Sequence, residues 1–132
     1  MMSSGTRKLP EPKLYEHTLP NGWQILAGRT DADNDRLSLR IARPNDWWFH
    51  VRGMPGSHVV LRVPEGEEAD RHILKQAAAV AAYYSKARSG GVVPVSVTQA
   101  KYVSKPRGAK QGTVEIHKEI VLKVRPGLPD GE

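Results

Sequence analysis

The segment 46–62 constrains the fold of this chain more than any other. Two runs of β-branched and aromatic residues, 47–51 and 58–63, flank a Gly-Met-Pro-Gly turn, and this order predicts a β-hairpin. Because side chains alternate along a strand, the first run divides into two faces: Trp48, His50 and Arg52 on one, and Trp47, Phe49 and Val51 on the other. The second face suits a hydrophobic core. The first carries an aromatic plane, an imidazole and a guanidinium, which suit base stacking and phosphate pairing.

The chain before this hairpin predicts a second hairpin and a short helix. Residues 14–19 and 23–28 flank Asn21-Gly22, a dipeptide that favours a tight hairpin turn. Apolar residues then recur at helical spacing, so we expect a short helix over 35–42 with Asp33 or Asn34 as its N-cap. A strand over 37–41 is the alternative.

The second half of the chain predicts one long helix followed by strands. The helix runs over 67–89, with an apolar stripe and a C-cap at Gly90-Gly91. The stripe comprises Ile73, Ala77, Val80, Ala81 and Tyr84. A strand over 92–97 carries Pro94, which indicates an edge position or a bulge. We expect this strand to continue through 98–103. A loop over 104–112 and final strands over 113–117 and 119–124 should follow.

This element order predicts an α+β fold. A largely antiparallel sheet has the long helix packed on one face, together with one short helix. The 132 residues suit one domain, which we place at 13–126, with a flexible arm at 1–12 and a flexible tail at 127–132.

The charge of the chain favours an anionic partner. The net charge is +6, which points first to nucleic acid. The sequence has no cysteine, which excludes disulfides and thiolate metal sites. No apolar run approaches the roughly 20 residues of a transmembrane helix, and no signal peptide is recognised. We therefore expect a cytoplasmic protein without a membrane partner.

A basic segment precedes the final two predicted strands. Lys101, Lys105, Arg107 and Lys110 lie within ten residues, with no acidic residue among them, and Gly108 and Gly112 lie in the same segment. Glycine allows a close backbone approach to phosphate, and each cation displaces about one counterion. A cationic loop is often merely solvated, but beside the Trp48 face it favours binding. We expect Trp48, His50 and His58 to lie in one concave surface bordered by this loop.

His50 and His58 allow several interpretations. Together with Asp46 they are a candidate zinc or manganese site or a hydrolytic centre, although the sequence offers only these two imidazoles and one plausible acid, and no base with an oriented partner. They are also candidates for hydrogen bonds that fix the Gly-Met-Pro-Gly turn, or for nucleic-acid contacts. We expect no metal and no cofactor. Tyr83 and Tyr84 are interpreted as core or boundary residues.

Motifs along nearly the whole chain resemble the NFACT-R domain, the RNA-binding module of NFACT proteins. They are Gly22-Trp-Gln-Ile-Leu-Ala-Gly-Arg29, Asn34-Asp-Arg-Leu37, Asp46-x-Trp48-Phe-His50, Pro55-Gly-Ser-His58-Val, Ala82-Tyr-Tyr-Ser85 and Lys105-Pro-Arg-Gly-Ala-Lys110-x-Gly112-x-Val114. The resemblance implies RNA binding, and the large relatives act on stalled large ribosomal subunits and tRNA in ribosome quality control. We expect a free-standing member, since 132 residues leave no room for the other domains of those relatives.

The sequence and the resemblance together predict a non-catalytic RNA-binding domain that contacts rRNA, tRNA or the large ribosomal subunit. Two alternatives stay open: an RNA-processing enzyme that uses Asp46, His50 and His58, and a protein-interaction adaptor. The predicted RNA-contacting residues are Asp46, Trp48, His50, Arg52, Gly56, Ser57, His58, Arg62, Lys101, Lys105, Arg107 and Lys110.

Overall fold

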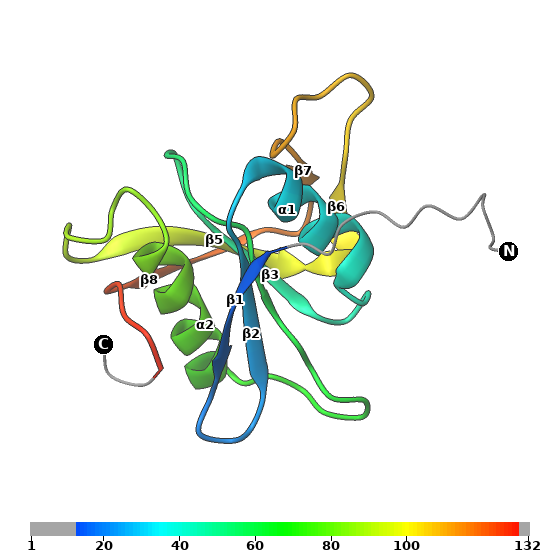
Figure 1. Cartoon of the computed structure of the whole chain (residues 1–132). Coiled ribbons are helices and arrows are strands. Elements are labelled where there is room, and N and C mark those ends of the chain that lie inside the picture. Colours follow the sequence, from blue (N-terminus) through cyan, green and yellow to red (C-terminus); the bar gives the residue numbers. More distant parts are fainter. Residues whose placement is uncertain (1–12, 130–132) are drawn as a thin grey trace, which may run out of the picture.

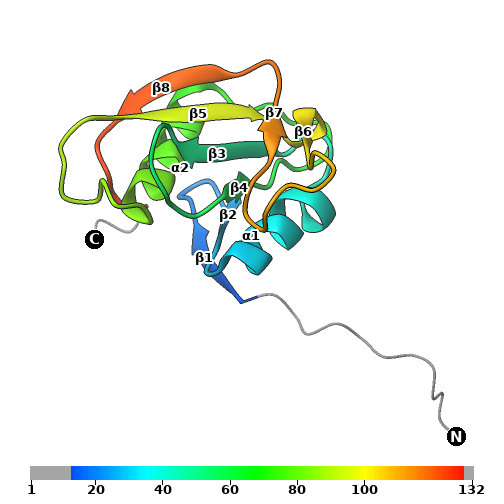
Figure 2. The same cartoon turned by 90° about the horizontal axis from the view of Figure 1, so that it is seen from above.

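A computed structural model describes residues 13–129. The predicted arm at 1–12 and residues 130–132 of the predicted tail lie outside this range. The fold is α+β, as predicted, with a six-stranded antiparallel sheet in the order β1-β2-β4-β3-β5-β8. Figures 1 and 2 show helices α1 and α2 in separate places around this sheet.

The sheet strands are β1 (Leu14–Thr18), β2 (Gln24–Gly28), β3 (Trp47–Val51), β4 (Val59–Leu61), β5 (Val93–Gln99) and β8 (Ile120–Val124). The helices are α1 (Asp31–Arg36), the π-helical turn η1 (Leu37–Ile41), α2 (Arg71–Tyr83) and the 3₁₀ turn η2 (Ala100–Tyr102). Strands β6 (Val103–Ser104) and β7 (Glu115–Ile116) form a separate two-stranded ribbon.

Both predicted hairpins are confirmed. Strands β1 and β2 pair antiparallel around Gly22, which has a φ of 91°, a left-handed conformation that glycine adopts without strain. Strand β3 pairs antiparallel with β4. The connection between them is longer than the Gly-Met-Pro-Gly turn, because β4 begins at Val59 and leaves His58 just before it.

The two faces of β3 are divided as the alternation predicts, but both are covered. Phe49 and Val51 are fully buried in the main core, and Trp47 packs against it. On the opposite face, Trp48 packs with Leu26, Leu37 and Val60 in a second cluster. This face is therefore not the open aromatic platform suggested by the sequence. Leu37 of η1 covers the Trp48 side chain on this face. The contact is favourable because burying a tryptophan ring removes a large apolar area from water.

The short helix begins earlier than predicted. It starts at Asp31, and the Thr30 side chain caps it by accepting a hydrogen bond from Asp33 N at 3.0 Å. Neither predicted cap serves this role. The Asn34 side chain instead accepts from His58 N at 3.0 Å. The chain continues helically through η1, so the alternative strand over 37–41 is wrong.

Helix α2 is shorter than the predicted 67–89. Asp70 caps its start by accepting from Ile73 N at 2.9 Å, because a carboxylate satisfies an amide that has no helical partner. The helix ends at Tyr83, since Ser85 forms a β-bridge with Gly56. The predicted C-cap at Gly90-Gly91 is therefore wrong. The apolar stripe is confirmed, and its alanines and Val80 are fully buried.

Pro94 does not mark an edge strand. Strand β5 lies inside the sheet, between β3 and β8. Pro94 O accepts a hydrogen bond from Arg52 N at 3.0 Å, one residue beyond the end of β3. The missing proline N–H thus falls where β3 has already ended, so no ladder bond of β3 is lost.

The C-terminal strands are shorter than predicted. Turn η2 interrupts the predicted continuation over 98–103. The predicted strands over 113–117 and 119–124 become β7 and β8, separated by Lys118 at a φ of 58°. Within residues 13–129, no helix combines the length and apolar character needed to span a bilayer.

Candidate nucleic-acid interface

Three aromatic rings from the β3–β4 region lie together beneath α1 and η1. The Trp48 ring stacks on His50 with centroids 6.1 Å apart, and it meets His58 edge-on at 5.2 Å. The two imidazoles are 5.5 Å apart. Trp48 and His58 are each 3% exposed, whereas His50 is half-buried. Trp48 therefore packs inside the fold and is not available for the base stacking that its strand face suggested. His50 is the ring of the three that solvent reaches.

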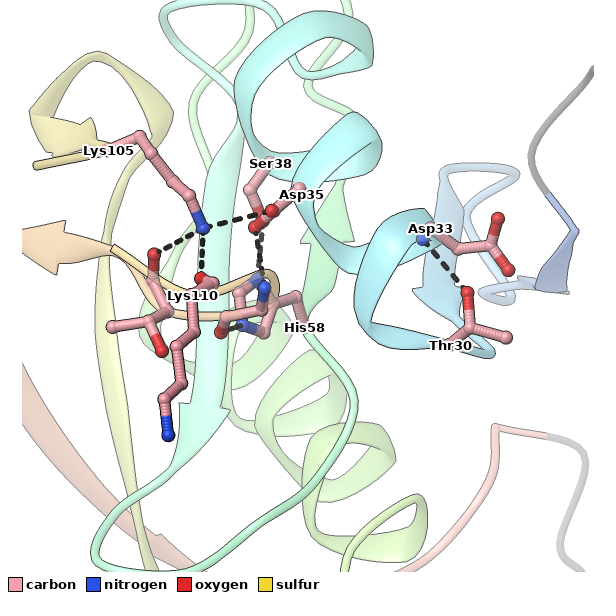
Figure 3. Close-up of polar contacts among 9 residues, drawn as sticks. Thr30, Asp33, Asp35, Ser38, His58, Lys105 and Lys110 are labelled. Atoms are coloured by element: carbon pink, nitrogen blue, oxygen red, sulfur yellow. Dashed lines mark hydrogen bonds and ion pairs between the residues drawn. The ribbon is translucent and has the colours of Figure 1, made fainter. Parts of the chain in front are cut away.

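Ser38 of η1 holds two of these rings. Its hydroxyl oxygen accepts a hydrogen bond from Trp48 Nε1 at 2.8 Å and lies 2.8 Å from His58 Nδ1. His58 Nε2 lies 3.1 Å from the Gly112 carbonyl. A carbonyl oxygen only accepts, so Nε2 carries the proton and Nδ1 accepts from Ser38. Each polar atom in this chain of bonds is satisfied (Figure 3).

Both imidazoles are held neutral. Burial lowers the pKa of His58 to about 4, and the neighbouring His50 acts in the same direction. Burial also lowers the pKa of His50, against smaller opposing effects from the backbone of Gly56 and Val51. Near pH 7 each ring is therefore a neutral hydrogen-bonding group and does not supply a positive charge to a phosphate.

The loop between β6 and β7 docks against α1 through one carboxylate. Lys105 Nζ lies 3.0 Å from Asp35 Oδ2 and 3.0 Å from the Thr113 carbonyl, and it also bonds the Lys110 carbonyl. Gly112 N donates to Asp35 Oδ1 at 3.1 Å. Figure 3 shows the Lys105 ammonium pointing into this cluster, while the Lys110 side chain points away from it. Lys105 thus shapes the loop.

The loop borders the histidines as predicted, but it covers His58 rather than framing an open concavity, and His50 stays partly exposed. Gly112 lies directly on His58. The exposed members of the predicted site are Arg52, Lys101, Arg107 and Lys110. Arg52 pairs with Glu119 at 3.6 Å, and Lys101 Nζ donates to Asn45 Oδ1 at 3.3 Å.

Asp46 and Arg62 form a separate ion pair at the start of β3. The Asp46 carboxylate is 1% exposed and accepts bonds from Arg43 N and Val63 N, both at 2.9 Å. Arg62 NH1 lies 3.2 Å from Asp46 and 2.9 Å from the Ile41 carbonyl. The structure thus does not join Asp46 to the histidines, and within residues 13–129 no three His, Cys, Asp or Glu side chains are grouped to hold a metal.

Gly56 and Ser57 join the β3–β4 loop to the end of α2. A Cβ at Gly56 would lie 2.8 Å from the Ser85 Cβ, so this close approach requires glycine. Ser57 N donates to the Tyr84 carbonyl at 2.9 Å, and Ser57 Oγ donates to the Gly28 carbonyl at 2.6 Å. Ser57, one of the predicted RNA-contacting residues, therefore has both its amide and its hydroxyl group engaged within the fold.

A basic pocket that the sequence analysis did not identify opens beside this junction. Its volume is about 370 Å³. Its charged lining residues are Arg29, Asp31, Lys86 and Arg88. Lys86 and Arg88 fall near the end of the helix predicted over 67–89. Arg29 lies within the Gly22–Arg29 motif, and that was the available signal.

A comparison with known protein families identifies the family of this chain. Residues 13–118 match the family described as the NFACT protein RNA binding domain. The chain belongs to this family. The resemblance read from the sequence motifs is thereby confirmed.

Individual proteins are similar to this chain over much of its length. The Rqc2 homolog RqcH of Bacillus subtilis is 39% identical over 117 residues, which cover 89% of this chain and 20% of that protein. A ribosome quality control complex subunit NEMF homolog of Drosophila melanogaster is 30% identical over 81 residues, 61% of this chain and 8% of that protein. The chain spans about a fifth of the RqcH sequence and less of the insect protein.

A solved structure shares this fold. It is the C-terminal part of the fibronectin/fibrinogen-binding protein from Streptococcus suis, with a TM-score of 0.80 and 34% identity. The match covers 92% of this chain and 47% of that one.

Proposed function

We propose that residues 13–126 act as a non-catalytic RNA-binding domain that contacts rRNA or tRNA at the large ribosomal subunit. The family is named for RNA binding, and two relatives are named for ribosome quality control or as homologues of Rqc2. The net charge of +6 suits a polyanionic partner.

One observation carries this proposal: the β6–β7 loop is ordered by Lys105 and Asp35, and it leaves Arg107 and Lys110 exposed. A cation on an anchored backbone loses less conformational entropy when it contacts phosphate than one on a free loop. The anchor therefore presents two phosphate ligands in a defined place.

The remaining predicted residues divide into two roles in this proposal. Contact residues are exposed or half-buried: Arg52, Lys101, Arg107 and Lys110 for phosphates, and His50 as a neutral hydrogen-bonding group. Residues that hold the surface in shape are those with satisfied internal contacts: Asp46, Trp48, Gly56, Ser57, His58, Arg62 and Lys105.

The test measures the salt dependence of RNA binding for the double variant Arg107→Ala/Lys110→Ala. Loss of two phosphate contacts should flatten the log–log slope by about 1.4 to 1.8, at about 0.7 to 0.9 per contact. The matched control is Lys75→Ala/Lys123→Ala, which removes two exposed cations from α2 and β8. Equal slopes for the wild-type protein and the loop variant, or no RNA binding by the wild-type chain, would contradict the proposal.

A further inference from the structure

The basic pocket is built by four segments that are distant in sequence. Strand β1 contributes Tyr15, and the turn from β2 into α1 contributes Arg29, Thr30 and Asp31. The β3–β4 loop contributes Gly56 and Ser57, and the chain after α2 contributes Tyr84, Ser85, Lys86 and Arg88. The β-bridge between Gly56 and Ser85 locks two of these segments together.

The charges of this pocket favour an anion. Arg29, Lys86 and Arg88 face it, and Asp31 is the one carboxylate among the described residues that line it. Serine, threonine and tyrosine residues complete the lining, and the hydroxyl groups of Thr30, Ser57 and Ser85 are bonded within the fold. The cations are therefore the groups that can bind a ligand, and guanidinium and ammonium groups are the usual ligands of phosphate oxygens in RNA complexes.

Aromatic rings support the two arginines. Tyr15 and Tyr84 stack with centroids 4.2 Å apart and an interplanar angle of 8°. The Arg29 guanidinium carbon lies 4.9 Å from the Tyr15 centroid, and that of Arg88 lies 3.9 Å from the Tyr83 centroid. Arg88 Nε also donates to the Tyr83 carbonyl at 2.7 Å. One face of Tyr15 meets Tyr84 and Arg29 lies against the ring, so the tyrosines position cations and do not serve as a base-stacking platform.

The pocket adjoins the β6–β7 loop. A Cβ added to Gly112 would lie 2.8 Å from Asp31 Oδ1, so the loop touches the rim of the pocket. Arg107 and Lys110 extend from the same loop. The loop cations and the pocket therefore lie on adjoining parts of the molecule, where one nucleic-acid strand can contact both.

We propose that this pocket binds the sugar–phosphate backbone of the same RNA strand that contacts the β6–β7 loop. The inference rests on the proposed function and extends it. It assigns phosphate contacts to Arg29, Lys86 and Arg88, and it makes binding there independent of base identity.

The first experiment removes the positive charge and keeps most of each side chain. In the variant Arg29→Gln/Lys86→Gln/Arg88→Gln, the log–log salt slope of RNA binding should flatten by about 2 to 3. The control Arg71→Gln/Lys75→Gln/Lys123→Gln removes three exposed cations outside the pocket and should change the slope by less than one. An equal effect of both triple variants would mean that net charge alone acts, and it would overturn the inference.

The second experiment predicts a gain of affinity, which a misfolded variant does not produce. Asp31→Asn removes the carboxylate from the pocket and should tighten RNA binding about two- to fivefold at low salt. Asp33→Asn lies in the same turn of α1 but does not line the pocket, and it should leave affinity unchanged. Unchanged or weaker binding of Asp31→Asn would count against the pocket.

The two proposals fail in different ways. If the wild-type protein binds no RNA, both are wrong. If Arg107→Ala/Lys110→Ala flattens the slope and the pocket triple variant keeps the wild-type slope, the inference about the pocket alone is wrong. Circular dichroism melts of each variant identify loss of folding. If the triple variant does not fold, the single exposed substitution Lys86→Glu replaces it, and the log–log salt slope should then flatten by about one to two.

Discussion

At the scale of single residues, Ser38 links the aromatic cluster to the body of the protein. It is 3% exposed, and its hydroxyl group both accepts from Trp48 and donates to His58. His58 passes the chain of hydrogen bonds on to Gly112 of the β6–β7 loop. The Gly112 carbonyl sets the tautomer of the imidazole, and the buried Ser38 hydroxyl group completes the chain of hydrogen bonds by donating to Nδ1.

Protonation of His58 should destabilise the fold. Its pKa is about 4 in the folded protein and about 6.5 in the unfolded chain, so the unfolded chain binds the additional proton between these values. The free energy of unfolding should therefore fall as the pH drops from about 6.5 toward 4. The expected loss is about 2 kcal/mol between pH 7 and pH 5, measured by urea unfolding.

The control for this pH dependence is His58→Gln. This variant is less stable at pH 7 but lacks the titrating group, so its unfolding free energy should change less over the same interval. Carboxylates contribute equally to both proteins. The same pH dependence in both would show that His58 is not responsible.

At the scale of elements, the β6–β7 loop is positioned by α1. Asp35 binds both Lys105 Nζ and Gly112 N, and these contacts join residues about seventy positions apart. The side chains of Lys105 and Asp35 are 26% and 17% exposed, so solvent screens the pair less than an ordinary surface pair. The early start of α1 at Asp31 thus matters for the site, because it places Asp35 in a regular helix.

Breaking this anchor should release the loop. In Asp35→Asn, the carboxylate is lost while the size of the side chain is kept, and amide hydrogen exchange of Gly112 and Thr113 should rise about tenfold. Arg107→Gln removes an exposed charge from the same loop and should leave exchange unchanged. Unaltered protection in Asp35→Asn would show that the backbone contacts alone hold the loop.

At the scale of the whole molecule, the sheet separates two cores. Helix α2 covers the face that carries Phe49 and Val51, and η1 covers the face that carries Trp48. The β6–β7 loop lies beside α1 (Figures 1 and 2), and its Gly112 adjoins Asp31 at the rim of the basic pocket. The proposed RNA path therefore crosses contacts between elements from both halves of the chain.

If one strand occupies the loop and the pocket together, their charge effects should add. The variant with Arg107→Ala, Lys110→Ala and glutamine at Arg29, Lys86 and Arg88 should flatten the salt slope by about 3.5 to 4.5. Titrations of a single-stranded RNA over a series of salt concentrations provide the measurement. A slope change no larger than that of the pocket variant would mean that the two regions bind alternative RNAs.

Much of the candidate site was predictable from the sequence, for reasons that are local. The loop motif from Lys105 to Gly112 and the His50 and His58 pair mark the region that the structure brings together. Roles within it were not predictable, since exposure depends on what covers a residue. Lys105 belongs to a residue type that binds phosphate, but its side chain points into the fold. Arg29 and Arg88 line the same pocket because the Gly56–Ser85 bridge joins segments that are distant in sequence.

The sequence by itself determined the α+β class, both hairpins and the apolar stripe of α2, because period-two alternation, turn residues and helical spacing act over a few positions. The start of each helix is a local feature, because Thr30 and Asp70 each cap an amide three residues further along the chain. Tertiary structure decided where α2 ends, since Ser85 leaves the helix to bridge to Gly56. It also decided that Trp48 is enclosed. A strand has two faces, and what covers each one depends on an element elsewhere in the chain, here η1.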